Sequence, residues 1–478
     1  MRRFILLFGV VLAVCFASSA SAVDVKLSGD LNNRFMLYTD QAGMFAGSET
    51  ISSRPINRDG VDEMWGEIKY RLTMEASTND GKVKGVYSIE LGALRFGDRS
   101  EISSGVLPTG DAAGTKGGGF SGDGINIETR FAYTDFQLPG VASKARLQIG
   151  LLPFTVNSFL WQETAMGVQF KGAAGPTDLT LAWVRGFENF NNDPDDDLFE
   201  DLDALLARVD FNIAKDIKAG VFGLYMTRNP GADAAASAAP DNVAVFSSGA
   251  HYQVKRLPNV DLDIWTLGVD GSANFGTVFV NWDLMYQGGT VEDNTAVERD
   301  ISAFLVHADV GVNLGKLKLT YTGWYASGDD NPADGDIENF LSVDVDRFDS
   351  IIFFEGGYTD DNYFTEAPHI LDKGLILNKI ALDYQATEKL KVGGAVLYLI
   401  TAEDLRYTDD AGVARSEDGL GTEIDAYVSY KLYKDLEFAV NAGYLIADDG
   451  MDFFDATGQR DGSGEDVFRS TARLRYLF

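Results

Sequence analysis

The sequence has only one cysteine, Cys15, and three histidines in 478 residues. A chain with one thiol cannot form an internal disulfide, and it lacks the thiolate sets that hold structural zinc, iron–sulfur clusters or c-type haem. No P-loop, nucleophile elbow or H-E-x-x-H motif accompanies the histidines. We therefore expect no cofactor, no metal centre and no enzymatic activity.

Basic residues and prolines are also scarce. Forty Lys and Arg stand against 72 Asp and Glu, which gives a formal net charge of −32. So acidic a surface repels the phosphate backbone, and nucleic acid is excluded as a partner. Eleven prolines stand against 51 glycines, while 45% of the residues are hydrophobic and 12% aromatic. This composition is too apolar for an acidic disordered chain and favours a large β structure.

A long apolar run occurs only at the start of the chain. Arg2 and Arg3 precede FILLFGVVLAVCFA, and small residues follow up to Ala22. This order is typical of a secretory signal peptide over residues 1–22, too short in its apolar part for a membrane helix. A lipoprotein site at Cys15 is not favoured, because Val14 stands where a small residue is required. Residues 23–478 then form a single domain.

Hydrophobic residues in this domain recur at every second position. In WGEIKYRLTMEA, Leu72 and Met74 alternate with Arg71, Thr73 and Glu75. The polar face is too charged for the core of a soluble sheet. We interpret the apolar face as lipid-facing and the charged face as the lining of a water-filled lumen, the pattern of a transmembrane β-barrel.

The alternation predicts eighteen antiparallel strands, whose boundaries are 24–38, 64–76, 83–95, 125–137, 144–152, 165–172, 178–187, 203–213, 217–227, 261–270, 275–288, 300–313, 317–327, 373–386, 389–402, 421–432, 436–447 and 466–478. Short turns alternate with long loops, as in an outer-membrane barrel with an even strand count. A barrel of sixteen strands is the second most favoured prediction. Segments 243–254 and 351–358 also look strand-like, and we place both in loops. Aromatic girdles are expected at the two membrane interfaces, formed by Trp65, Trp183, Tyr286, Tyr325, Tyr398 and Tyr444 on one side and Phe211, Tyr384, Tyr430 and Phe478 on the other.

The last thirteen residues, DVFRSTARLRYLF, alternate and end on Phe478. This strand resembles the last strand of Gram-negative outer-membrane β-barrel proteins. The segment RFAYTDF followed by ARLQIG is similar to the region of porins that precedes their third loop, which here covers residues 153–164. The resemblance implies passive diffusion of small hydrophilic solutes and ions, contact with outer-membrane lipid and lipopolysaccharide, a homotrimer, and a third loop that narrows the pore. An ordinary extracellular loop is the alternative for this segment.

Basic residues of five predicted strands lie on the polar, lumen-facing side: Arg34, Lys69, Arg71, Arg130, Arg146, Arg469, Arg473 and Arg475. Closure of the barrel makes the first, second and last strands neighbours, so we predict that these basic residues form a strip on one wall, opposite Glu163 of the third loop. The field between the strip and Glu163 would orient solutes in transit. In the alternative interpretation these cations pair locally with acidic residues and only keep the lumen wet.

Two loops, 189–203 and 328–339, are rich in carboxylates. They could hold Ca²⁺, but neither has EF-hand spacing, and a solvated loop is favoured. His307 and Asp309 would both face the lumen, where we expect a hydrogen-bonded rather than a catalytic histidine.

The function that we predict is that of a general diffusion porin. A channel selective for anions, carboxylates or sugars is the alternative, and an outer-membrane phospholipase or protease is disfavoured because histidines are so few. An energised transporter needs an N-terminal plug domain, for which this chain has no room before its first strand. A sheath for a haem protein would need a partner that binds the haem.

Overall fold

The computed structural model describes residues 23–41, 61–96, 117–118, 127–141, 145–187, 202–228, 254, 260–292, 297–332, 334–345, 347–354, 358, 367–409, 411–456 and 464–478. Among these residues no helix has both the length and the apolar character needed to cross a membrane. The predicted signal peptide, residues 189–201 of the acidic loop 189–203 and nearly all of segment 243–254 lie outside this description, and so does His251.

Eighteen long strands make up the fold, and their bounds are β1 (Val23–Gln41), β2 (Val61–Thr78), β3 (Val83–Phe96), β5 (Glu128–Gln137), β6 (Arg146–Asn157), β7 (Trp161–Ala174), β8 (Thr177–Phe187), β9 (Leu202–Ala214), β10 (Ile217–Arg228), β11 (Asp261–Phe275), β12 (Val278–Glu292), β13 (Glu298–Leu314), β14 (Leu317–Ala326), β16 (Leu375–Gln385), β17 (Leu390–Thr408), β18 (Ala414–Lys431), β19 (Leu436–Ala447) and β20 (Val467–Leu477). Each pairs antiparallel with the next along the chain. Two short strands, β4 (Gly117–Gly118) and β15 (Asp336–Ile337), add parallel to β3 and β13. Before β20 lie the 3₁₀ turn η4 (Asp449–Met451) and helix α3 (Asp452–Ala456).

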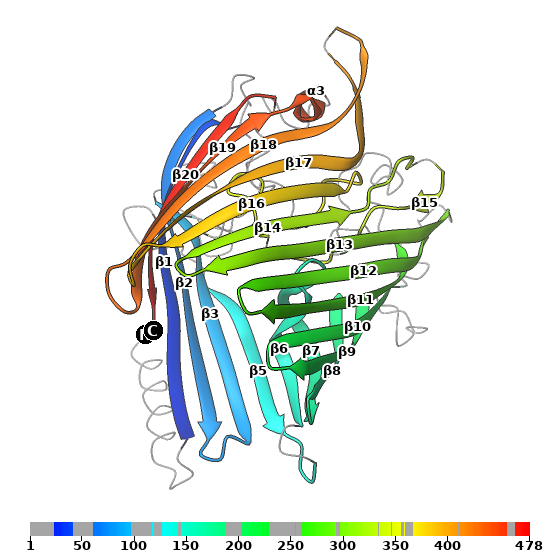
Figure 1. Cartoon of the computed structure of the whole chain (residues 1–478). Helices are drawn as coiled ribbons and strands as arrows, with labels where there is room; N and C mark the ends of the chain where they lie inside the picture. Colours follow the sequence, from blue (N-terminus) through cyan, green and yellow to red (C-terminus); the bar gives the residue numbers. More distant parts are fainter. Residues whose placement is uncertain are drawn as a thin grey trace, which may run out of the picture.

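The first and last strands close the ring. Asp30 to Thr39 of β1 pair with Phe468 to Leu477 of β20, and the backbones of Gly29 and Phe478 exchange hydrogen bonds of 2.9 and 3.1 Å. Figure 1 shows the blue strands β1 and β2 beside the red strand β20. The eighteen-stranded antiparallel barrel predicted from the sequence is confirmed.

Side chains alternate between the two faces of the wall in the order that the sequence predicts. On β1, Leu27 and Phe35 are 56% and 49% exposed on the outer face, whereas Arg34 and Met36 on the inner face are almost fully buried. The charged residues therefore lie inside and the apolar residues outside, the reverse of a soluble protein and the pattern of a barrel in lipid. An outer band of exposed aromatics includes Trp183, Tyr286, Tyr398, Tyr444, Phe211, Tyr384, Tyr430 and Phe478.

Trp65 does not belong to that band, and its assignment to a girdle was wrong. It pairs in register with Met36, which faces inward, and its ring stacks on the buried ring of Tyr38 at a centroid distance of 4.9 Å. The strand β2 begins three residues earlier than the pattern predicted, and the parity of its charged residues places Trp65 on the lumen side.

Two of the predicted loops are instead largely strand. Residues 153–164 continue β6 to Asn157 and begin β7 at Trp161, so that only the turn 158–160 separates them. Residues 403–420 extend β17 and β18 into a hairpin around residues 409–413. In the β6 extension the apolar residues Phe154 and Val156 face inward and are buried, whereas Pro153 and Thr155 are exposed on the outer face. A search for a lipid-facing apolar stripe misses such a strand, because no such stripe is required outside the membrane.

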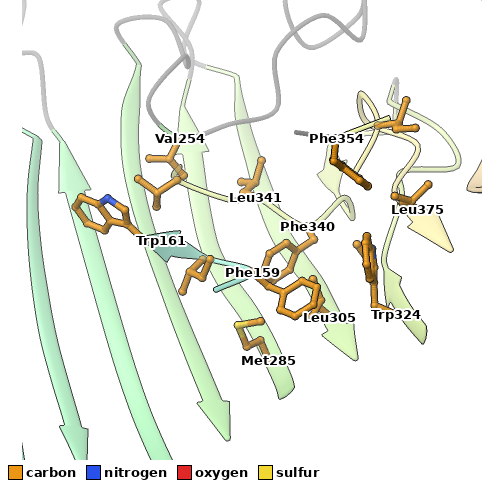
Figure 2. Close-up of a cluster of buried hydrophobic side chains, with 14 of the residues drawn as sticks. Phe159, Trp161, Val254, Met285, Leu305, Trp324, Phe340, Leu341, Phe354 and Leu375 are labelled. Carbon is orange, nitrogen blue, oxygen red and sulfur yellow. The ribbon is translucent and has the colours of Figure 1, made fainter. Parts of the chain in front are cut away.

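The barrel is not an empty tube. The β6–β7 hairpin and the connection between β14 and β16 bring apolar side chains against the inner wall, where they form one buried cluster with wall residues. Figure 2 shows Phe159 and Trp161 of the hairpin gathered with Phe340, Leu341 and Phe354 of the connection and with Met285, Leu305 and Trp324 of the wall. Residues 351–354 form bends within this connection, so the described part of the strand-like segment 351–358 is not a strand, as predicted.

Candidate functional site

The turn of the β6–β7 hairpin, residues 157–160, is called the hairpin tip below. It reaches strands that lie far from its own position in the ring. The Nδ2 atom of Asn157 donates to Asp283 of β12 at 2.6 Å and to Asp270 of β11 at 3.1 Å. Arg208 of β9 donates from Nη1 to the carbonyl of Val156 at 3.1 Å. Because β7 is separated from β12 by four strands along the ring, the hairpin crosses part of the lumen.

Aromatic packing completes the attachment of the hairpin tip. The Phe159 ring, almost fully buried, lies 4.6 Å from the ring of His307 and 5.5 Å from that of Trp324 between ring centres. The guanidinium of Arg347 covers the Phe159 ring at 3.7 Å and the Trp324 ring at 4.9 Å. A buried aromatic ring of this size contributes several kcal/mol to local stability, about 3 to 5 on truncation to alanine. The tip is therefore firmly seated against β13 and β14.

Residues 341–345 and 347–354, called the lumen segment below, run from the hairpin tip to the other side of the barrel. The Val343 N–H donates to the Leu160 carbonyl and the Gln162 N–H to the Asp344 carbonyl, each at 2.8 Å. Near its start, Gln287 of β12 brackets Leu341, accepting from its N–H at 2.8 Å and donating to its carbonyl at 2.9 Å. Backbone hydrogen bonds thus join the hairpin and the lumen segment into one body.

At its far end the lumen segment is bound by side chains of the wall strands β18 and β20. Glu423 of β18 accepts from the Ser350 hydroxyl and from the N–H groups of Ile351 and Ile352. Arg469 of β20 donates to the Ile351 carbonyl at 2.7 Å. Beyond the segment, Arg34 of β1 donates to the Tyr358 carbonyl at 3.2 Å. The inserted body therefore spans from the hairpin to the closure of the ring.

The structure divides the eight predicted pore-lining cations into two groups. Arg34, Arg469 and Arg473 are buried: the first pairs with Glu67, the second with the lumen segment, and the third with Glu437 at 2.8 Å while covering the Tyr358 ring. The other five face the lumen with 15% to 34% of their side-chain surface exposed, namely Lys69, Arg71, Arg130, Arg146 and Arg475.

Local pairing accompanies these exposed cations, as the alternative interpretation expected. Lys69 lies 3.1 Å from Glu90 of β3, Arg71 also pairs with that carboxylate, and Arg130 approaches it to 3.8 Å. Arg146 pairs with Asp135 at 2.6 Å, and Arg475 with Asp30 at 2.6 Å. Each of these five side chains also keeps some surface open inside the barrel, where water screens the attraction of a partner.

Glu163 is exposed and pairs in register with Phe154, whose ring points into the buried cluster. It therefore lies on the same face of the hairpin as Phe154, and its action on solutes in transit stays a prediction. Sequence patterns missed the residues that seat the hairpin and the lumen segment: Asn157, Phe159, Arg347 and Glu423. The available signal was weak, since only the apolar character of Phe159 and Leu160 within a supposed loop pointed to a buried tip.

His307 is the centre of a polar network below the hairpin tip. Its Nδ1 lies 2.6 Å from Asp283 and its Nε2 lies 3.3 Å from Asp309, which also accepts from the Thr322 hydroxyl at 2.6 Å. The ring is thus hydrogen-bonded on both sides and packed by Phe159. This confirms the hydrogen-bonded lumen histidine that the sequence predicted.

Acidic loop 328–339 brings three carboxylates together. Ligand oxygens of Asp329, Asp330 and Glu338 all lie within 4.8 Å of one another. Asp329 is buried and hydrogen-bonds the Asn331 N–H at 3.0 Å. Burial, with a contribution from the nearby Asp372, raises the pKa of Asp329 to about 6. This part of the loop is therefore partly folded rather than uniformly solvated.

Comparison with known proteins gives a result for structure alone. No protein-family model matches the chain, and no curated protein matches its sequence. Among solved structures, Acinetobacter baumannii OccAB4 is similar at 11% identity over 95% of this chain and 98% of that one, with a TM-score of 0.53. Pseudomonas aeruginosa OprD is similar at 13% identity over 95% of each chain, with a TM-score of 0.51. Pseudomonas aeruginosa OpdK, solved with vanillate, is similar at 12% identity over 95% and 98%, with a TM-score of 0.50. The fold is that of the bacterial outer-membrane porins.

Proposed function

We propose that this protein is an outer-membrane channel through which small hydrophilic solutes and ions diffuse, with passage limited by the hairpin tip and the lumen segment. The observation that carries the proposal is the inverted barrel: its outer face is apolar, and cations on its inner face reach water. Channels select solutes by the width of the pore and by the electric field of the charges that line it. The inserted segments of this lumen limit its width, and its water-exposed charges supply the field.

Selection by charge is the finer part of the proposal. Lys69, Arg71 and Arg130 approach the same carboxylate, Glu90, and keep exposed surface in the lumen. A solute that carries a carboxylate can exchange places with such a screened partner, because both offer the same acceptor oxygens. The complex of OpdK with vanillate shows that a protein of this fold has been solved with a small aromatic carboxylate. We therefore favour a channel with a preference for anions over a pore without selectivity.

Planar-bilayer recordings test both parts. Purified protein is expected to give stepwise conductance, and reversal potentials in asymmetric KCl are expected to show anion preference. Replacing Arg71 and Arg130 by Gln should lower the anion-to-cation permeability ratio, by about twofold or more. Lys82→Gln is the matched control, because Lys82 lies on the exposed β2–β3 turn. Absence of ion passage contradicts the channel itself, whereas unchanged reversal potentials contradict only the role of these two arginines.

One other functional class and two predicted associations are tested on the same preparation. An outer-membrane phospholipase would hydrolyse lipid in detergent, and we expect no such activity because His307 is enclosed by two aspartates and the Phe159 ring. Homotrimer formation and binding of lipopolysaccharide stay predictions of the family resemblance. Native mass spectrometry of the purified protein would measure the number of chains and any retained lipopolysaccharide.

A further inference from the structure

The lumen segment is attached to the wall by a set of hydrogen bonds that the proposed function alone does not require. Its residues 350–353 form a compact turn, since the Ser350 hydroxyl oxygen accepts from the N–H groups of Ile352 at 3.1 Å and Phe353 at 2.7 Å. A serine used in this way closes a local turn and aligns successive N–H groups. One side of the turn consequently presents donors.

A carboxylate on β18 fills that donor side. Glu423 accepts the Ser350 hydroxyl at 2.5 Å, the Ile351 N–H at 2.7 Å and the Ile352 N–H at 3.0 Å, and its side chain has no solvent exposure. Successive backbone N–H groups of this kind form an anion-binding nest. Hydrogen bonds to an ionised acceptor are roughly twice as strong as neutral ones, and loss of the acceptor would leave buried donors unpaired.

Two cations from flanking strands hold the acceptor side of the same turn. Arg469 of β20 donates to the Ile351 carbonyl at 2.7 Å and to the Phe354 carbonyl at 3.4 Å. Lys379 of β16 donates to the Asp349 carbonyl at 2.6 Å. One charged side chain from each of three wall strands thus binds backbone atoms of a stretch of six residues, and Glu423 also accepts from the Ser350 hydroxyl.

The intervening strand β19 leaves room for the turn. At Gly443 an added Cβ would lie 3.1 Å from the Cβ of Ile351 and 2.9 Å from the carboxylate of Asp425. The glycine therefore lets the backbone of the lumen segment lie directly against the wall. Any larger side chain at this position would push the turn toward the centre of the barrel.

We propose that Glu423, Arg469 and Lys379 are positioning residues that hold the lumen segment against the β16–β20 wall and thereby set the width of the channel. This inference rests on the proposed function, because width has a consequence only if solutes pass. It assigns to Arg469 a different task from that of the exposed cations: Arg469 shapes the path, whereas Arg71 and Arg130 act on the charge of the solute.

The first test compares conductance with ion selectivity. Glu423→Ala removes the acceptor from three donors, and we expect single-channel conductance to change by roughly twofold or more because the freed segment alters the cross-section of the path. Glu423→Gln keeps one acceptor oxygen and should change conductance less. Arg71→Gln is expected to do the opposite, shifting the reversal potential with little change in conductance. Unboiled gel mobility and circular dichroism show whether each variant forms the barrel.

The second test restores the attachment by a different bond. The predicted mature chain has no cysteine, so Ile351→Cys and Gly443→Cys can be introduced alone, and their Cβ separation of 3.1 Å is within about 1 Å of that in disulfides. In the Glu423→Ala background, oxidation should return the conductance to that of the two-cysteine protein that keeps Glu423, and reduction should reverse this. A folded Glu423→Ala variant with wild-type conductance overturns the proposal, as does a cross-link that forms without restoring conductance.

A third measurement separates this inference from the proposed function. The rate of cross-linking between the two introduced cysteines reports the position of the lumen segment even if no current flows. We expect that rate to fall at least about threefold when Glu423 is replaced by Ala, since a thiol pair reacts only when it meets. Equal rates with Glu423 and with Ala overturn the inference. Wild-type protein without conductance but with the expected difference in rate contradicts the channel and leaves the attachment established.

Discussion

The guanidinium of Arg347 lies 3.7 Å from the centre of the Phe159 ring, and this contact joins the two segments that enter the barrel. Arg347 also donates to the Ser158 carbonyl at 3.2 Å and pairs with Asp349. The hairpin tip and the lumen segment therefore support each other on the inner side of the wall. Each would lose buried contacts if the other moved.

Truncation of the ring tests that mutual support. Phe159→Ala removes a buried aromatic side chain and the surface on which Arg347 lies, so we expect the hairpin tip to be destabilised by about 3 to 5 kcal/mol. Hydrogen exchange of residues 155–162 and 341–349 should accelerate in both segments together. The control is Phe304→Ala, because Phe304 is exposed on the outer face of β13 and its loss should leave this exchange unchanged. Faster exchange in the hairpin alone would contradict the coupling.

A fall in pH should have opposite effects on the contributions that Asp329 and His369, both in the β14–β16 connection, make to stability. Burial raises the pKa of Asp329 from 3.8 to about 6, so its protonated form is favoured in the fold and its contribution to stability grows as the pH falls toward 4. Burial lowers the pKa of His369 from 6.5 to about 4, so stability is lost as the pH falls through that range. The neutral ring hydrogen-bonds Leu371 and Ser342. The pKa values of Asp372 and Glu338 are also raised by burial.

Variants separate the two contributions. Between pH 7 and pH 4.5, the protection of residues 327–345 against hydrogen exchange should rise less in Asp329→Asn than in wild type. It should rise more in His369→Gln than in wild type. We expect each difference to be on the order of 1 to 3 kcal/mol. Hydrogen exchange corrected for the intrinsic effect of pH measures both. The assignment fails if the two substitutions change the pH dependence in the same direction.

The inverted wall predicts that one charge has different effects on the two faces of a strand. Leu284 of β12 is 47% exposed on the outer face near the middle of the strand. Leu284→Lys is expected to cost about 2 to 4 kcal/mol when the barrel is in lipid. Asn281→Lys, on the inner face beside Asp309, should be tolerated within about 1 kcal/mol. Reversible unfolding in phospholipid vesicles measures both, and equal costs would contradict the assignment of the faces.

The barrel wall could be predicted from the sequence because lipid imposes a strict period on it. Each strand needs apolar residues at every second position, and this requirement repeats eighteen times with turns between. The inward parity of Arg34, Lys69 and Arg71 followed directly from that period. Trp65 has the same parity, and its assignment to an outer girdle was wrong because it did not follow that period.

The inserted segments could not be predicted, because no period governs them. The hairpin tip is held by Asn157, Phe159 and Arg347. Asn157 hydrogen-bonds to strands that lie more than a hundred residues away in the sequence. Nothing in the sequence distinguishes Glu423 within its predicted strand, although it accepts from the Ser350 hydroxyl and from the N–H groups of Ile351 and Ile352. Contacts between distant parts of the chain depend on the geometry of the closed ring, which alternation alone does not specify.

Closure of the ring has a consequence for the order of assembly. The contacts to Tyr358 and to Ile351 come from Arg34 on the first strand and Arg469 on the last, whereas Glu423 lies on a strand two positions before the last. These groups surround the inserted chain only after the two ends of the sheet have met. During assembly the first and last strands must therefore pair before the channel reaches its final width. The appearance of that final width reports closure of the barrel.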